Sequence, residues 1–98
     1  MRIDRSDEPG VVRLALHGEL DLATADLLDR AVTAVLAEPP PQLVLDLADL
    51  TFCDSAGLDA LLTARAGAFA RDVRLRAVGA RGIVHRTMTV TGLLELLS

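Results

Sequence analysis

Ser55 is the residue of this sequence whose side chain and neighbours best suit a reversible chemical modification. It lies between an apolar run, residues 43–47, that predicts a buried strand, and an apolar segment, residues 58–69, that predicts a helix. Backbone N–H groups at a helix start are unpaired, and the helix dipole is positive there. A phosphate on the Ser55 hydroxyl would therefore meet a favourable site, which makes Ser55 a candidate switch residue.

The same residues also have a purely structural interpretation. Either Asp54 or Ser55 could cap the helix that Ala56 is expected to begin. Gly57 argues against a helix start that needs only a cap, because a glycine in the first turn costs up to about 1 kcal/mol relative to alanine. Its missing side chain would leave open space beside Ser55 for a partner to approach the backbone. From the residues alone, cap and switch both stay open.

The chain lacks the residues that other kinds of functional site require. His17 and His85 lie far apart and there is one cysteine, so we expect no metal site. Ser55 lacks the Gly-x-Ser-x-Gly turn of serine hydrolases, and its segment has no lysine and too few glycines for a phosphate-binding loop. Paired carboxylates such as Glu19 and Asp21 are explained by charge near helix starts. We therefore expect no enzymatic activity and no cofactor.

The composition predicts one small folded domain, residues 1–98. Half of the chain is apolar, and ten basic against fourteen acidic residues give a net charge of −4, which argues against nucleic-acid binding. No apolar run approaches the roughly 20 residues that span a bilayer, and the polar N-terminus does not resemble a signal peptide. The lone Cys53 is expected in the core, and a cytoplasmic location fits it.

The expected order of elements is β-β-α-β-α-β-α. Strands are expected at residues 1–5, 11–17, 43–47 and 73–78, and helices at residues 21–38, 56–70, 83–90 and, as a short turn or helix, 93–97. This alternation predicts an α/β fold with a mixed sheet of about four strands, whose first two form a hairpin at Pro9-Gly10. The helices should all lie on one face. The other face would carry polar strand residues, namely His17, Arg13, Arg74 or Arg76.

Local signals set the expected helix boundaries. Asp21 is a good N-cap for the first helix, and the prolines at 39–41 stop that helix. Gly92 is expected to end the third helix in a left-handed conformation. The inner stripe of the second helix should consist of its spaced apolar residues, Leu58, Leu61, Leu62, Ala66 and Phe69.

Residues 45–58, LDLADLTFCDSAGL, resemble the signature of STAS domains, and most closely that of bacterial anti-sigma-factor antagonists. Two further segments agree in the same order. Residues 18–25, GELDLATA, resemble the family's first loop and helix start, and residues 90–97, VTGLLELL, resemble its closing segment. The resemblance covers nearly the whole chain and implies a STAS-like fold.

This resemblance implies a binding switch. In this family the unphosphorylated antagonist binds an anti-sigma factor and thereby frees a sigma factor. The anti-sigma factor is often a serine kinase of the histidine-kinase-like ATPase type, which modifies the serine after the signature aspartate, here Ser55. A PP2C-type phosphatase reverses the mark. Many members carry a second hydroxyl at the next position, which is Ala56 here, so Ser55 is the only hydroxyl of the Asp-Ser-Ala-Gly motif.

The partner-binding surface is expected to surround this serine. Its predicted residues are Glu19, Asp21, Thr24, Asp54, Ser55, Ala56, Gly57, Leu58 and Asp59. Three rival functions stay open at this point: a nucleotide- or small-molecule-binding module, a scaffold subunit of a larger signalling complex, and an enzyme with a serine nucleophile. The first rival lacks a glycine-rich cradle, and its candidate arginines are scattered along the chain. The net charge and the few aromatic residues favour a monomer.

Overall fold

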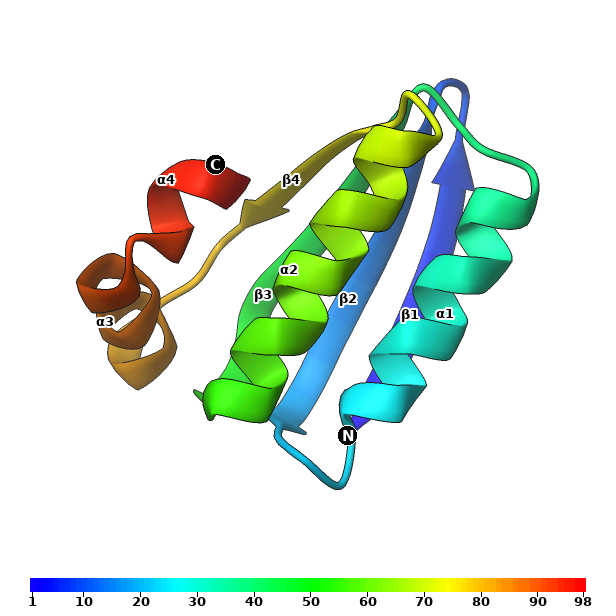
Figure 1. Cartoon of the computed structure of the whole chain (residues 1–98). Coiled ribbons are helices and arrows are strands. Elements are labelled where there is room, and N and C mark those ends of the chain that lie inside the picture. Colours follow the sequence, from blue (N-terminus) through cyan, green and yellow to red (C-terminus); the bar gives the residue numbers. More distant parts are fainter.

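The computed structural model describes all 98 residues, which form one sheet and four helices (Figure 1). The strands are β1 (Arg2–Glu8), β2 (Val11–Leu20), β3 (Gln42–Cys53) and β4 (Arg74–Val78). The helices are α1 (Ala25–Ala37), α2 (Ser55–Ala70), α3 (Gly82–Thr91) and α4 (Leu93–Leu97). The sheet has the order β1-β2-β3-β4; β1 runs antiparallel to β2, and the other neighbours are parallel. The predicted mixed four-stranded α/β fold is confirmed.

The N-terminal hairpin turns at the predicted dipeptide. Glu8 pairs with Val11, so Pro9 and Gly10 alone form the connection. Gly10 has a φ of +80°, in the left-handed region that favours glycine. The hairpin prediction is therefore confirmed, although β1 continues three residues beyond its expected end at Arg5.

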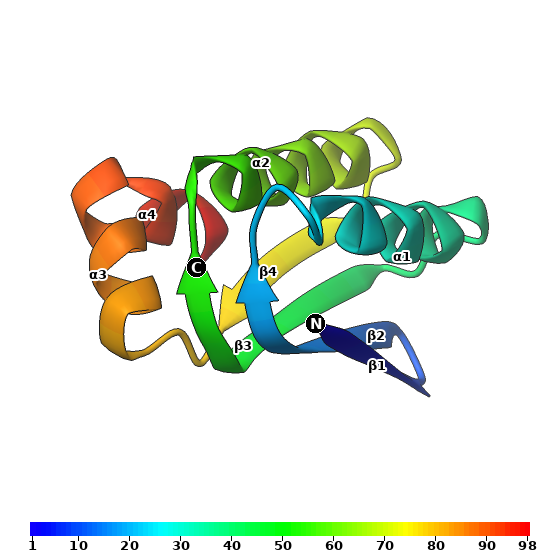
Figure 2. The same ribbon diagram turned by 90° about the horizontal axis from the view of Figure 1, so that it is seen from below.

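The helices and the polar residues lie on opposite sides of the sheet. Figure 2 shows α1 and α2 above one face, while α3 and α4 lie at the β4 side. The core between the layers is aliphatic and includes the fully buried Leu14, Leu16 and Leu45. The other face has no helix over it and carries Arg13, whose Nη1 lies 3.2 Å from Asp46 Oδ2. The expected polar face is also formed by His17, Arg74 and Arg76.

Strand β3 is longer than predicted, and this correction matters for the site. The polar residues Asp46 and Asp49 suggested an end at Leu47, but pairing with β2 continues to Cys53 opposite Leu20. The register shifts twice along this ladder, as at β-bulges. A bulge changes which side chains face the core, so the polar residues reach solvent without ending the strand. Only Asp54 separates β3 from α2.

The inner face of α2 also differs from the predicted stripe. Phe69 is 81% exposed and Ala66 is exposed, so their placement in the core was wrong. The residues that are buried instead are mostly small, namely Gly57, Ala60, Leu61, Ala64 and Ala68. Apolar residues occur around most of this helix, so spacing alone could not select the buried face. The small residues let α2 pack closely against α1 and the sheet.

The chain ends as predicted in two short helices. Gly92 terminates α3 with a φ of +80°, and its N–H donates to the Thr89 carbonyl. Helix α4 then buries Leu93 and Leu97. No helix of the structure combines the length and the apolar character needed to cross a membrane.

Candidate phosphorylation and docking site

The predicted site residues gather at one end of the molecule. Here β2 and β3 end side by side, and α1, α2 and α3 begin; Figure 2 looks onto this end. The Asp54 N–H donates to the Leu20 carbonyl over 3.3 Å, which ties the start of α2 to the end of β2. The first loop and the signature segment are thus brought together through residues 34 positions apart, Leu20 and Asp54, as the resemblance implied.

Of the two possible caps, Asp54 is the one that caps α2. Its Oδ1 accepts from the Gly57 N–H at 2.9 Å, and its extended backbone, with φ −95° and ψ −172°, is that of an N-cap residue. Ser55 is the first residue of α2 and is exposed. Its hydroxyl makes no hydrogen bond within the chain, because the capping role is already filled. The structure therefore leaves this oxygen free for chemistry.

Gly57 does not provide the open space that was expected beside Ser55. It is buried, and a Cβ at this position would lie 2.4 Å from the Leu20 carbonyl oxygen and 2.8 Å from the Cys53 Sγ. No side chain fits at such distances. Glycine is therefore required so that the first turn of α2 can pack on the end of β2. Its contribution to the site is to hold Ser55 in place, and not to admit a partner.

The connection between β2 and α1 is a hydrogen-bonded turn. The Asp21 carboxylate accepts from the Ala23 N–H at 3.0 Å and from the Thr24 N–H at 3.1 Å. The Thr24 Oγ1 accepts from the Asp21 N–H at 2.9 Å and donates to the Glu19 carbonyl at 2.8 Å. Helix α1 begins only at Ala25, so the expectation that Asp21 is its N-cap was wrong. Asp21 instead stabilises the turn that precedes the helix.

The site has an excess of negative charge. Glu19 and Asp59 are exposed, and Asp21 and Asp54 are partly exposed. None of these four carboxylates belongs to an ion pair, whereas Asp26 on α1 is paired with Arg30 at 2.8 Å. Ser55 therefore lies among uncompensated negative charges, and a phosphate there would add to them.

Cys53 is a core residue that lies against Gly57 in the first turn of α2. It is buried, as predicted from its apolar neighbours. Burial, together with the nearby negative charge of Asp54, raises the pKa of its thiol to about 11. A thiol with such a pKa is protonated at neutral pH and a poor nucleophile. Cys53 is therefore a packing residue of the site.

The remaining predicted residues are divided between surface and interior. Ala56 and Leu58 are partly buried, because one side of the first turn of α2 packs inward. Two apolar side chains that the sequence analysis did not select, Leu22 and Phe52, are exposed at this end with exposed fractions of 82% and 42%. Leu22 lies in a polar turn outside any helical stripe, and that position was the signal that could have found it.

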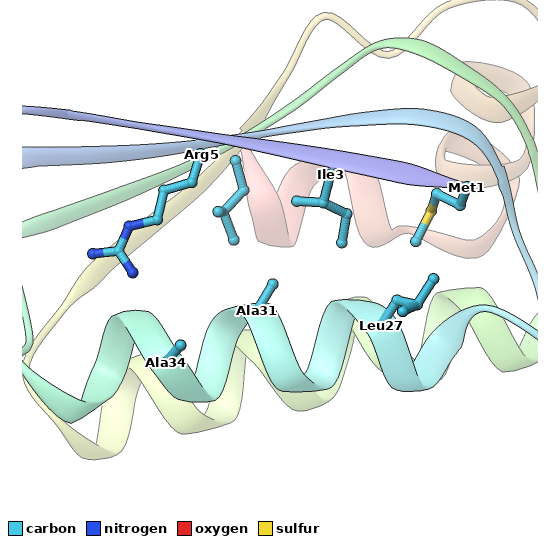
Figure 3. A pocket seen from close by; sticks show the side chains of 7 residues that line it. Met1, Ile3, Arg5, Leu27, Ala31 and Ala34 are labelled. Atoms are coloured by element: carbon cyan, nitrogen blue, oxygen red, sulfur yellow. The ribbon is translucent and has the colours of Figure 1, made fainter.

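A separate apolar groove of about 280 Å³ lies between β1 and α1 (Figure 3). The side chains of Met1, directly before β1, and of Ile3 on β1 point toward Leu27 and Ala31 of α1. The one charged residue of the groove, Arg5, is held by Asp7 through bonds of 2.8 and 3.0 Å. None of the predicted site residues lines this groove, and it offers a nucleotide few polar partners.

Fold and site together define the class of protein. A family model described as "Mlab, STAS domain" matches residues 1–98, and the chain belongs to the STAS domain family. It is 34% identical over 88 residues to the anti-sigma-F factor antagonist RsfB of Mycobacterium tuberculosis (strain ATCC 25618 / H37Rv), an alignment that covers 90% of this chain and 71% of RsfB.

Solved structures agree with this assignment. An anti-sigma factor antagonist from Mycobacterium paratuberculosis has a TM-score of 0.81 and 32% identity, with 98% of this chain and 81% of that chain covered. The anti-sigma factor antagonist SpoIIAA in its unphosphorylated form also has a TM-score of 0.81, at 20% identity, with 96% and 84% covered. At that identity, SpoIIAA shows the shared fold.

Proposed function

We propose that this chain is an anti-sigma-factor antagonist that acts in the cytoplasm as a binding switch and catalyses no reaction itself. In its unphosphorylated form it binds an anti-sigma factor and so releases a sigma factor. The anti-sigma factor is a serine kinase of the histidine-kinase-like ATPase type, phosphorylates Ser55 and thereby ends the interaction; a PP2C-type phosphatase restores it. The observation that carries the proposal is the free, exposed Ser55 hydroxyl on a helix start whose cap is supplied by Asp54.

The fold is expected to tolerate the phosphate. Ser55 is the first residue of a 16-residue helix, where unpaired N–H groups and the helix dipole favour negative charge. Its hydroxyl supports no other part of the structure, so modification breaks no hydrogen bond. Phosphorylation therefore changes the surface and leaves the architecture in place.

The interface is expected not to tolerate it. A phosphate adds about −1.5 to −2 charges beside the unpaired carboxylates of Glu19, Asp21, Asp54 and Asp59. Like charges brought together at an interface can cost several kcal/mol. A loss of about 3 kcal/mol weakens binding more than 100-fold, since each 1.4 kcal/mol is a factor of ten. The switch is then local electrostatics and sterics without refolding.

The proposed docking surface comprises the residues that the resemblance selected, with roles refined by their positions. Glu19, Ser55 and Asp59 are exposed and available for direct contact. Thr24 and Gly57 hold the two loops in shape, through hydrogen bonds and through close packing. The partner should therefore bind the first group, and removal of the second should distort the surface.

The test is a binding titration with the histidine-kinase-like anti-sigma factor of the same organism. Ser55→Ala should bind at least as tightly as the unmodified chain, and Ser55→Asp more than 100-fold more weakly. Ser6→Asp is the matched control, because Ser6 is an exposed serine on β1. Mass spectrometry after incubation with ATP and the kinase should find one phosphate, on Ser55. Tight binding by Ser55→Asp would contradict the proposal.

A ligand-binding module is the second candidate, because the groove of Figure 3 has room for a small apolar molecule. Calorimetry with GTP and ATP tests its nucleotide version. We expect no heat of binding, since Arg5 already has its carboxylate partner. Saturable binding of either nucleotide would favour the second candidate.

A further inference from the structure

Three exposed apolar side chains that do not line the groove of Figure 3 occur at the Ser55 end of the molecule. Leu22 lies in the turn before α1, Phe52 near the end of β3, and Ile83 in the first turn of α3, with exposed fractions of 82%, 42% and 53%. They come from three different elements, and none belongs to the hydrophobic core. Large apolar side chains that no fold contact requires at one end of a molecule indicate an interaction surface.

Phe52 belongs to the signature segment, and contacts of that segment connect it to the elements that carry Leu22 and Ile83. Phe52 is paired in register with Glu19, at the beginning of the first loop that contains Leu22. Ile83 lines a hollow together with Thr51, the residue before Phe52. Leu22, Phe52 and Ile83 thus follow the route from the first loop across β3 to the start of α3, and Ser55 begins the next element after β3.

We infer that Leu22, Phe52 and Ile83 are the anchor side chains with which this chain docks on its anti-sigma factor, an inference that rests on the function proposed above. The docking surface thereby extends beyond the signature segment to the start of α3. Its complement is a partner face with apolar hollows for these three side chains and basic groups opposite Glu19, Asp21 and Asp59. A few buried apolar anchors carry most of the affinity of such interfaces, and the charged rim contributes mainly selectivity and association rate.

The anchors also explain how one phosphate can end the interaction. When they are buried in the partner, water is excluded from this end of the molecule, where Ser55 begins α2 three residues after Phe52. A dianion enclosed there loses its hydration, and because the partner's basic groups already face Glu19, Asp21 and Asp59 it gains no cation of its own, which is more costly than the same charge on an open surface. Apolar anchoring further implies that the unphosphorylated complex persists at high salt, because salt screens charged contacts and not apolar ones.

The experiment measures by calorimetry the affinity of variants of this 98-residue chain for the histidine-kinase-like anti-sigma factor of the same organism. Leu22→Ser and Ile83→Ser should each weaken binding at least tenfold. Phe69→Ser and Val90→Ser are the matched controls, because these side chains are 81% and 79% exposed but lie away from Ser55, near the ends of α2 and α3. The controls should bind within twofold of the unmodified chain. Thermal unfolding should be unchanged for Leu22→Ser, which removes a side chain with few contacts.

The outcomes separate this inference from the proposed function. If Ser55→Asp abolishes binding while Leu22→Ser and Ile83→Ser bind normally, the switch stands and the anchors are refuted. If the control variants lose as much affinity as the anchor variants, the anchors are also refuted, because any apolar surface residue would then matter. If the unmodified chain does not bind the anti-sigma factor, the proposed function fails, and this inference fails with it.

Discussion

Two hydroxyl side chains stand at the starts of neighbouring helices and are used in opposite ways. The Thr24 hydroxyl, before α1, accepts from the Asp21 N–H and donates to the Glu19 carbonyl. The Ser55 hydroxyl, at the start of α2, bonds to nothing in the chain because Asp54 caps that helix. A hydroxyl that holds the fold cannot be modified without loss of its bonds, whereas an unused one can. The difference supports the proposal that Ser55, and not Thr24, is the residue that is modified.

The largest expected effect concerns the packing that holds Ser55 in place. Gly57→Ala puts a Cβ 2.4 Å from the Leu20 carbonyl oxygen, which is backbone and has no room to yield. We expect a loss of about 3 kcal/mol in unfolding free energy, measured by urea denaturation. Gly67→Ala on the same helix is the control, because its Cβ would meet only the end of the Leu36 side chain, at 3.3 Å. Equal stability of the two variants would contradict the proposed role of Gly57.

The comparison of the two hydroxyls can be tested directly by removing each one. Thr24→Val leaves the Asp21 N–H and the Glu19 carbonyl without their partner, which should cost about 2 kcal/mol. Ser55→Ala removes no hydrogen bond and should change the unfolding free energy by less than about 0.5 kcal/mol. A larger cost for Ser55→Ala than for Thr24→Val would reverse the assignment of structural and free hydroxyl.

Ionisation of Cys53, the residue before the cap Asp54, should lower the unfolding free energy at alkaline pH. The pKa of Cys53 is raised in the folded state from an ordinary value of 9.0 to about 11, so the folded chain retains the proton that the unfolded chain loses. Stability is therefore complete below pH 9 and falls by about 1 to 2 kcal/mol as the pH rises to 11. The sequence has neither lysine nor tyrosine, so no other side chain titrates in this window. Cys53→Ala should abolish the slope in chemical denaturation measured from pH 8 to 11.

The smallest effect distinguishes Asp54, which caps α2, from Asp59, which lies within α2. Asp54→Ala removes the bond to the Gly57 N–H and should cost about 1 kcal/mol, most of which Asp54→Asn retains. Asp59→Asn is the control, because Asp59 is exposed and accepts no bond. Thermal unfolding of the three variants checks this order. An Asp54→Ala variant as stable as Asp59→Asn would mean that Ser55 caps the helix instead.

Much of the fold followed from local signals in the sequence. The turn at Pro9-Gly10, the left-handed Gly92 and the alternation of strands and helices were sufficient to predict the mixed sheet. The length of β3 was not predictable, because Asp46 and Asp49 have the appearance of a strand end. Only the bulged pairing with β2, a long-range contact, shows that the strand continues.

The sequence was a better guide to which residues belong to the candidate site than to the role of each residue. Ser55 and Asp54 were identified from their place before a helix, but spacing could not decide which of the two is the cap. The role of Gly57 depends on Leu20, a residue 37 positions away, and therefore needed the tertiary structure. The exposure of Phe69 and the burial of Ala60 depend on how α2 packs in an apolar environment, which periodicity does not determine.

The direct passage from β3 into α2 has a consequence for the kinase that we propose acts on Ser55. With one residue between strand and helix, and with Gly57 locked against Leu20, the acceptor oxygen is presented on a rigid helical turn. The enzyme must recognise a folded surface, because the segment has no extended conformation to offer a peptide-binding cleft. A synthetic peptide of residues 48–62 will accordingly be a poor substrate, and the kinase will not phosphorylate the whole chain once it is unfolded.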